Sequence, residues 1–198
     1  MTQKIYIFKK FERFWHWSQA ALIIFLMATA FDIHGTYTVF GFEKAVIYHR
    51  LAAWTLVGLW VFAIFWHLAT GEWRQYAPTS KNVIAMAKYY LSGIFKHAPH
   101  PHRQTELQKH NPLQKLAYLF ILAFVAPLLW TTGWLLLFWD SLEAWGLGNL
   151  QLEWIAIGHT IGAFLMLIFL IAHLYLITAG ATLTSHLKAM ITGWEEVH

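Results

Sequence analysis

Two histidines bracket an apolar run in the sequence HTIGAFLMLIFLIAH, which covers residues 159–173. An imidazole nitrogen can bind iron or another metal, and it can carry a proton near neutral pH. If the segment is helical, the 14 residues from His159 to His173 turn through an angle about 40° short of four full turns, so both side chains share one face. They then lie about 21 Å apart along the helix axis. Because the hydrocarbon core of a bilayer is about 30 Å thick, the pair can serve two sites stacked across a membrane.

The composition indicates a membrane protein. Hydrophobic residues make up 58% of the 198-residue chain and charged residues 12%, about half the charged fraction of a soluble domain. The chain contains no cysteine, which excludes thiolate-bound iron–sulfur clusters, c-type haem attachment and disulfides within it. Any redox centre here must therefore be held by histidine. The net charge of +4 is compatible with nucleic acid, but the basic residues lie beside apolar segments, which favours membrane topology and no nucleic-acid partner.

Four apolar segments each have about the 20 residues that a membrane-spanning helix needs. They cover residues 14–33, 46–69, 116–139 and 154–178. We therefore predict an all-α integral membrane protein, a four-helix bundle that forms a single domain over residues 1–198.

A further helix is predicted on the membrane surface between the second and third spans. Over residues 80–96 apolar side chains recur at helical spacing and lysines take the other side, which is typical of an amphipathic helix. Ser80 is its expected N-cap. The HAPHPH segment that follows, with His97, His100 and His102, predicts either a metal site or a solvated turn, and its prolines favour the turn.

The basic residues orient the chain in the membrane. Eleven of them precede the first span or lie between the second and third, whereas the other two connections hold only Lys44 among Lys and Arg. Cytoplasmic loops carry the excess of Lys and Arg, so both termini are predicted to be cytoplasmic. The eleven are Lys4, Lys9, Lys10, Arg13, Arg74, Lys81, Lys88, Lys96, Arg103, Lys109 and Lys115.

The depths of the span histidines predict two layers of imidazole pairs. His49 and His159 lie at the outer ends of their spans, while His173 lies at an inner end and has two possible partners, His16 and His67. Two such layers in a four-helix bundle suit two haems, each iron held by two facing helices. His49 and His67 are about 27 Å apart along one helix, which matches the 21 Å of the fourth span poorly, so His16 is the preferred inner ligand and His67 the alternative.

Two other classes remain open at this point. A diiron-type membrane oxygenase needs several closely spaced histidine boxes, whereas the span histidines here stand singly. A haem-free transporter or membrane anchor is the other alternative.

Three motifs resemble one family, the bacterial cytochrome b subunits that accompany formate dehydrogenase, Ni,Fe-hydrogenase and thiosulfate reductase. FERFWHWSQAALIIF at 11–25 is similar to the first span of that family, KHNPLQK at 109–115 to the segment before its third span, and KAMITG at 188–193 to its tail. The spacing from His159 to His173 and the small residue Gly162 resemble the family's fourth span. The resemblance covers nearly the whole chain.

This resemblance implies a multi-pass protein of the bacterial inner (plasma) membrane with two b-type haems. It implies that electrons pass between menaquinone or ubiquinone and a periplasmic redox subunit of the iron–sulfur, molybdenum, nickel–iron or multihaem type. The implied ligands are His16, His49, His159 and His173. An asparagine of the family's quinone site near the inner haem matches Asn111.

Neighbouring polar residues are candidates for supporting roles. Arg13 and Arg50 lie beside two of the histidines, where they are either partners of haem propionates or ordinary cations at helix ends. Asn111, with Gln114 or Lys115, lies where quinone carbonyls can meet donors, and His110 or Glu106 are candidates for the accompanying proton. Capping of the third span by Asn111 is the structural alternative.

Small residues and one proline are expected to shape the spans. Ala52, Ala53, Gly133 and Gly162 either leave room for flat porphyrins or pack helices together. Pro127 is expected to bend the third span.

The predicted topology is open to a direct test. A reporter fused after His198 should report the cytoplasm, and one inserted near Gly146 should report the opposite side, because the eleven cations hold the connecting segments inside. Activity of paired reporters that function on only one side of the membrane makes the measurement. Reversed signals would invert every depth assigned above.

Overall fold

The computed structural model describes residues 3–96, 98–99, 101–102, 105, 108–180 and 182–197. The expectations for His97, His100, Arg103 and Glu106 fall outside these residues. Residue contacts divide the chain into two compact units. The first comprises Met1–Ala77, Arg103–Lys109 and Gly180–His198, and the second comprises Pro78–His102 and His110–Ala179.

The first unit is built on the antiparallel helices α1 and α2. Phe11 near the start of α1 stacks on Trp66 near the end of α2, with ring centroids 4.6 Å apart, whereas Thr29 near the end of α1 meets His49 near the start of α2. The elements of this unit are β1 (Gln3–Tyr6), α1 (Lys10–Ile33), α2 (Phe42–Thr70), the 3-10 turn η1 (Glu72–Tyr76), α7 (Ser185–Thr192) and β2 (Trp194–Val197).

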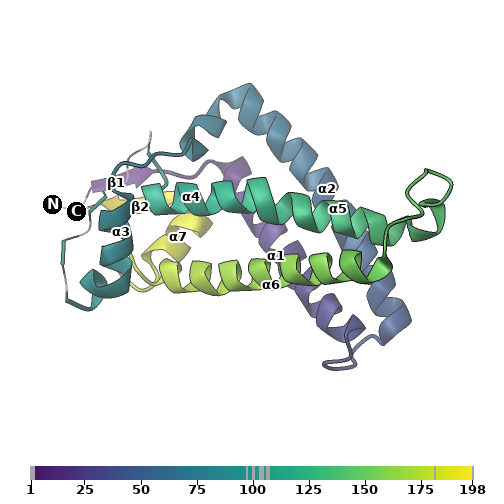
Figure 1. Ribbon diagram of the computed structural model, residues 1–198. Coiled ribbons are helices and arrows are strands. Elements are labelled where there is room, and N and C mark those ends of the chain that lie inside the picture. The colour runs from purple at the N-terminus through teal and green to yellow at the C-terminus, as the bar shows by residue number, and fades with distance from the viewer. Residues whose placement is uncertain are drawn as a thin grey trace. The chain divides into compact units, whose positions relative to one another are not determined.

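The second unit contains another antiparallel pair, in which the ribbon runs from α4 into α5 as one rod beside α6 (Figure 1). Tyr118 and Phe169 meet at one end and Thr132 and His159 at the other. The elements of this unit are α3 (Val83–Lys88), η2 (Tyr89–Gly93), η3 (Ile94–Lys96), α4 (Pro112–Phe120), η4 (Ile121–Val125), α5 (Ala126–Leu137), η5 (Trp139–Ser141) and α6 (Leu152–Ile177).

Among the described residues, four helices are long and apolar enough to cross a membrane, which confirms the all-α membrane class. They run over Lys10–Ile33, Phe42–Thr70, Pro112–Leu137 and Leu152–Ile177, so the first three begin four residues earlier than predicted. The reason is that a helix continues through polar residues at the membrane edge until a capping residue ends it. Gly71 ends α2 with a positive φ of 76°, which favours glycine.

Pro127 affects the backbone of the third span one turn before its own position. A proline ring clashes with the carbonyl four residues earlier, here that of Ala123. The chain meets this by a π-helical turn over Ile121–Val125, and α5 then starts with Pro127 in its first turn. The structure thus shows a π turn before Pro127, and the expected bend of the third span stays a prediction.

The surface segment between the second and third spans departs from the prediction. It is helical from Val83 to Lys96 but passes through α, π and 3-10 geometry, and Asn82, with φ 62°, caps it in place of Ser80. Met86 and Tyr90 pack against Ala179. An apolar stripe on the other side is largely exposed, which suits contact with lipid and comprises Ile84, Leu91 and Phe95.

The terminal segments of the first unit fold together, an element that the sequence did not predict. β1 and β2 pair antiparallel, and Gly193 between α7 and β2 accepts hydrogen bonds from Ile7 and Phe8. A Cβ on Gly193 would come within 2.8 Å of the Phe8 carbonyl oxygen, so this position of the KAMITG motif requires glycine. From α1, Arg13 donates to the carbonyl of Ile191, and Trp17 Nε1 donates to that of Met190 at 3.1 Å.

A buried cation joins three segments of the same unit. Lys109 Nζ lies 2.8 Å from Glu12 Oε1 and 2.9 Å from Glu72 Oε2, and its backbone N–H donates to Gln75. The side chains of Lys109 and Glu12 are each only 4% exposed. Burial opposes ionisation of Glu72, but hydrogen bonds and charges from Lys9 and Lys109 outweigh it and lower its pKa below 4.5. Glu72 therefore stabilises the fold above about pH 4.5, and this contribution disappears as the pH falls through the lowered pKa.

We expect Lys109→Met to destabilise the protein strongly, because it leaves Glu12 and Glu72 without their shared cation. Breaking a buried ion pair from one side costs about 3–5 kcal/mol. Thermal melting of the purified protein in detergent measures the effect, with Lys10→Met as the control because Lys10 is exposed. Equal melting temperatures for the two variants would show that the buried network contributes no net stability.

Candidate functional site

His49, in the second turn of α2, is held by the helix beside it. Its Nδ1 lies 3.0 Å from Thr29 Oγ1 of α1. Thr29 is completely buried, and its hydroxyl is also 3.0 Å from the carbonyl oxygens of Phe25 and Leu26. The threonine therefore sits between its own helix backbone and the imidazole.

His159 repeats this arrangement in the second unit. Its Nδ1 lies 3.0 Å from Thr132 Oγ1 of α5, and Thr132 also donates to the Leu128 carbonyl one turn earlier. Gly133 lies close to the same imidazole, because a Cβ built there would be 3.2 Å from His159 Cε1. Gly162 admits the side chain of Leu129 in the same way. Within this unit both glycines pack the helices together, which is the second of the two roles considered for them.

These contacts are compatible with one protonation pattern for both rings. A threonine hydroxyl has one hydrogen, and in each case a backbone carbonyl lies within hydrogen-bonding distance to accept it. With the hydrogen placed there, the oxygen accepts from the imidazole, and Nδ1 of His49 and of His159 carries the N–H. Nε2 consequently carries the lone pair that can coordinate iron. The chemistry of these two rings therefore fits axial ligation of haem.

His16 lies near the start of α1, at the end of the first helix pair that is away from His49. His173 lies near the end of α6, away from His159. His173 of α6 stacks on Phe169 with centroids 5.9 Å apart and an interplanar angle of 15°. His16 of α1 meets Trp17 edge to face at 5.2 Å. Both imidazoles are half-buried, as are those of His49 and His159.

His67 is more enclosed than the other span histidines. It is 8% exposed, and Trp15, Trp66 and Tyr76 surround its ring with centroids 5.0–5.4 Å away. Nδ1 lies 2.7 Å from the Ala63 carbonyl, which assigns the N–H to Nδ1. Nε2 is buried and has no hydrogen-bond partner among the described residues. The aromatic enclosure leaves less room for a flat macrocycle on this ring than on the half-buried ones.

The two arginines differ in their surroundings. Arg13 bonds the last turn of α7, where a cation is favourable because helix C-terminal carbonyls carry partial negative charge. Arg50 is exposed on α2 beside His49. Of the two, Arg50 has the more open side chain for an anionic group at the membrane edge.

The polar cluster before the third span forms a helix cap. Asn111 Oδ1 accepts from the backbone N–H of Gln114, and Gln114 Oε1 accepts from that of Asn111, both at 2.9 Å. Asn111 Nδ2 donates to the Tyr90 hydroxyl at 2.8 Å, and burial raises the pKa of Tyr90 to about 12, so this hydroxyl stays protonated. The structure thus shows the capping role of Asn111. One amide hydrogen of Asn111 and the amide group of Gln114 remain as donors, and Lys115 is half-buried beside them.

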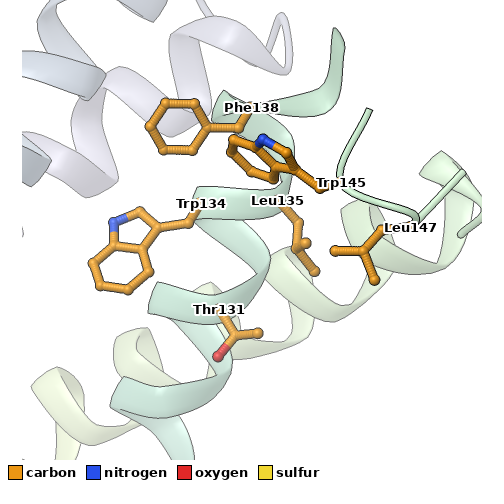
Figure 2. A pocket seen from close by; sticks show the side chains of 6 residues that line it. All are labelled: Thr131, Trp134, Leu135, Phe138, Trp145 and Leu147. Atoms are coloured by element: carbon orange, nitrogen blue, oxygen red, sulfur yellow. The ribbon is translucent and has the colours of Figure 1, made fainter. Parts of the chain in front are cut away.

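An apolar pocket of about 310 Å³ opens in the second unit where α5 ends (Figure 2). Trp134 and Leu135 come from the last turns of α5, and Phe138 directly follows that helix, while Trp145 and Leu147 come from the loop beyond it. Thr131 completes the lining and supplies its single hydroxyl. The lining contains no histidine or charged side chain, so the pocket suits a hydrocarbon group.

Sequence reasoning missed Thr29 and Thr132. Both are polar residues inside apolar spans, and each lies on the helix before its histidine in the chain. A search for hydroxyl residues within the spans would have listed them among several other threonines. Only the helix pairing selects these two.

Comparison with known proteins identifies relatives of this chain. The family described as prokaryotic cytochrome b561 matches residues 7–193. The Escherichia coli (strain K12) protein named "Putative cytochrome YdhU" is 30% identical over 200 residues, which cover 97% of this chain and 75% of that protein. No solved structure shows a significant match.

Proposed function

This chain belongs to the prokaryotic cytochrome b561 family, and we propose that it is a di-haem electron carrier linking membrane quinone to a periplasmic redox subunit. Membership of the family makes it a multi-pass bacterial membrane cytochrome b that takes part in electron transfer. The number of haems, the quinone, the inner membrane as location and the type of partner belong to the proposal.

The observation that carries the proposal is the pair of threonine-bound histidines. His49 and His159 each present an Nε2 lone pair, and each comes from a different helix pair. A b haem held by two histidines would take one such nitrogen from each of them. In this proposal His49 and His159 hold the outer haem.

The inner haem is held by His16 and His173 in the same proposal. Support comes from their half-buried rings and from the resemblance of their motifs to the family's ligands. His67 is the alternative to His16. Its N–H also goes to an oxygen, but its ring is enclosed by three aromatic side chains.

The haem supplies the electron-accepting chemistry when it is bound, and the protein supplies ligands, depth and electrostatics. Arg50, exposed at the outer end of α2, offers a cation to a propionate near His49. Arg13 offers its remaining N–H groups near His16, while one N–H stays on α7.

Quinone exchanges electrons at the cytoplasmic end, at the start of α4, in this proposal. Gln114 and Lys115 are half-buried there, and Asn111 holds the turn that presents them. A quinone carbonyl needs a hydrogen-bond donor in such a partly dry site, and these side chains carry donors beyond those used in the cap. His110, whose ring lies 5.1 Å from that of Tyr118, is the candidate for the accompanying proton.

A histidine-cluster oxygenase is less well supported. A diiron centre needs several histidine or carboxylate side chains around one site, and the described residues include no group of three or more placed to share a metal ion. Every observation that suits a haem-free anchor is also explained by a cytochrome.

Haem counts of histidine variants test the ligand pairs. The purified protein should contain two b haems per chain by pyridine haemochrome assay. His159→Ala should remove the outer haem and keep the inner one, and His173→Ala should do the reverse, because each loses one of two axial nitrogens. Two haems at full occupancy in both variants would refute the assignment.

The same assay decides between the inner candidates. We expect His16→Ala to lose the inner haem and His67→Ala to keep it. The opposite pattern would transfer the inner ligand to His67.

Asn111 variants test the quinone site separately from the helix cap. Asn111→Ala should lower stability by about 1 kcal/mol through loss of the cap. It should also slow haem reduction by quinol about tenfold or more, because a hydrogen bond that helps to hold the quinone is lost. Asn111→Ser retains a capping oxygen but no amide, so it should restore the melting temperature and leave the reaction slow. If Asn111→Ser reacts at the unsubstituted rate in stopped-flow, Asn111 serves the fold alone.

A further inference from the structure

We infer that Thr29 and Thr132 are positioning residues that fix the tautomer of the two outer ligands and thereby set the potential and retention of one haem. The inference rests on the proposed function, since it assumes that His49 and His159 bind haem. It adds two residues that touch no iron and act through the imidazoles.

Thr29 and Thr132 each make one hydrogen-bonding contact beyond the one that a threonine inside a helix often makes. A threonine inside a helix often donates to the carbonyl one turn earlier, as Thr55 does to Leu51 at 2.9 Å. Thr29 and Thr132 make that bond and also lie 3.0 Å from an imidazole Nδ1 of the neighbouring antiparallel helix, from which we infer that they accept its N–H. Their exposed fractions of 0% and 8% keep water from competing for the contact.

The arrangement occurs twice in helices that share no sequence repeat. In the first unit the threonine lies on α1 and the histidine on α2, and in the second unit they lie on α5 and α6. Both oxygen to Nδ1 distances are 3.0 Å. Both pairs involve the histidines proposed as ligands of the outer haem, so each proposed ligand has the same contact.

The chemical effect follows from the direction of the hydrogen bond. An oxygen that accepts the Nδ1 hydrogen makes Nε2 a stronger electron donor to iron and prevents the ring from taking the other tautomer. Stronger donation favours the ferric state. Removing the hydroxyl should therefore raise the midpoint potential of the outer haem and weaken its binding.

Isosteric variants separate this role from packing. Thr132→Val and Thr29→Val keep the side-chain shape and remove the acceptor, while Thr132→Ser and Thr29→Ser restore the hydroxyl. Thr131→Val is a matched control on α5, because Thr131 is exposed next to Thr132, and Thr55→Val is the control on α2. The measurements are redox titration of the intact haem-loaded protein, its low-spin electron paramagnetic resonance spectrum, and haem transfer to apomyoglobin.

We expect each valine variant at 29 or 132 to raise the outer potential and weaken haem retention about 10-fold to 100-fold, with the inner haem unchanged. The serine variants and both controls should match the unsubstituted protein. Unchanged potential and retention in both valine variants would overturn the inference. So would equal losses from both haems, since these would show general destabilisation. If one valine variant fails to fold, the other decides, because the two pairs lie in different units.

The His159→Ala variant separates this inference from the proposed function. If His159→Ala keeps both haems, the ligand assignment itself fails. If His159→Ala loses the outer haem while Thr132→Val and Thr29→Val behave like their controls, only the positioning role fails.

Discussion

The candidate site depends on one constraint, which is the cost of leaving an imidazole nitrogen unsatisfied inside a membrane. An unpaired polar group in hydrocarbon costs several kcal/mol, and water is not at hand to relieve it. At His49 and His159 a threonine oxygen on the adjacent helix lies 3.0 Å from Nδ1. In the proposed function Nδ1 donates to that oxygen and Nε2 is the nitrogen offered to iron. The contact inside each helix pair then prepares the proposed ligand before haem binds.

This constraint also requires the helices to keep their register. A shift of one residue between α1 and α2 would carry Thr29 away from His49. The first unit fixes that register at its other end, where Phe11 stacks on Trp66 and Lys109 ties Glu12 to Glu72. In the second unit the close contact of Leu129 with Gly162 sets how α5 and α6 meet. Packing far from the histidines therefore determines whether their hydrogen bonds can form.

The sequence predicted the class of fold because long apolar segments leave few alternatives in a membrane. It predicted helix ends less well, because Lys10 and Glu12 are polar yet helical, and only caps such as Gly71 and Asn111 set the boundaries. The histidine positions were readable from spacing and depth. Thr29 and Thr132 were not, since their importance depends on which helix lies beside them. Lys109 was read as an ordinary cytoplasmic cation, and nothing local distinguishes it from the exposed lysines nearby.

Ion pairs and neutral hydroxyl contacts lie at different places along the helices, and the reason is dielectric. Charged groups meet at the start of α1 and the end of α2, where Lys109 balances two carboxylates at the membrane edge. At the other ends of α1 and α2, and between α5 and α6, the histidines proposed as ligands meet neutral hydroxyls. A carboxylate would hold an imidazole more strongly, as it does in many soluble metal sites. Its charge would itself need a partner, however, and ionisable residues inside spans are costly. A threonine oxygen can accept a hydrogen bond while its hydroxyl donates to a helix carbonyl, so no polar hydrogen is left without a partner. A hydroxyl in place of a carboxylate therefore suits the proposal that these histidines bind a metal within membrane-spanning helices.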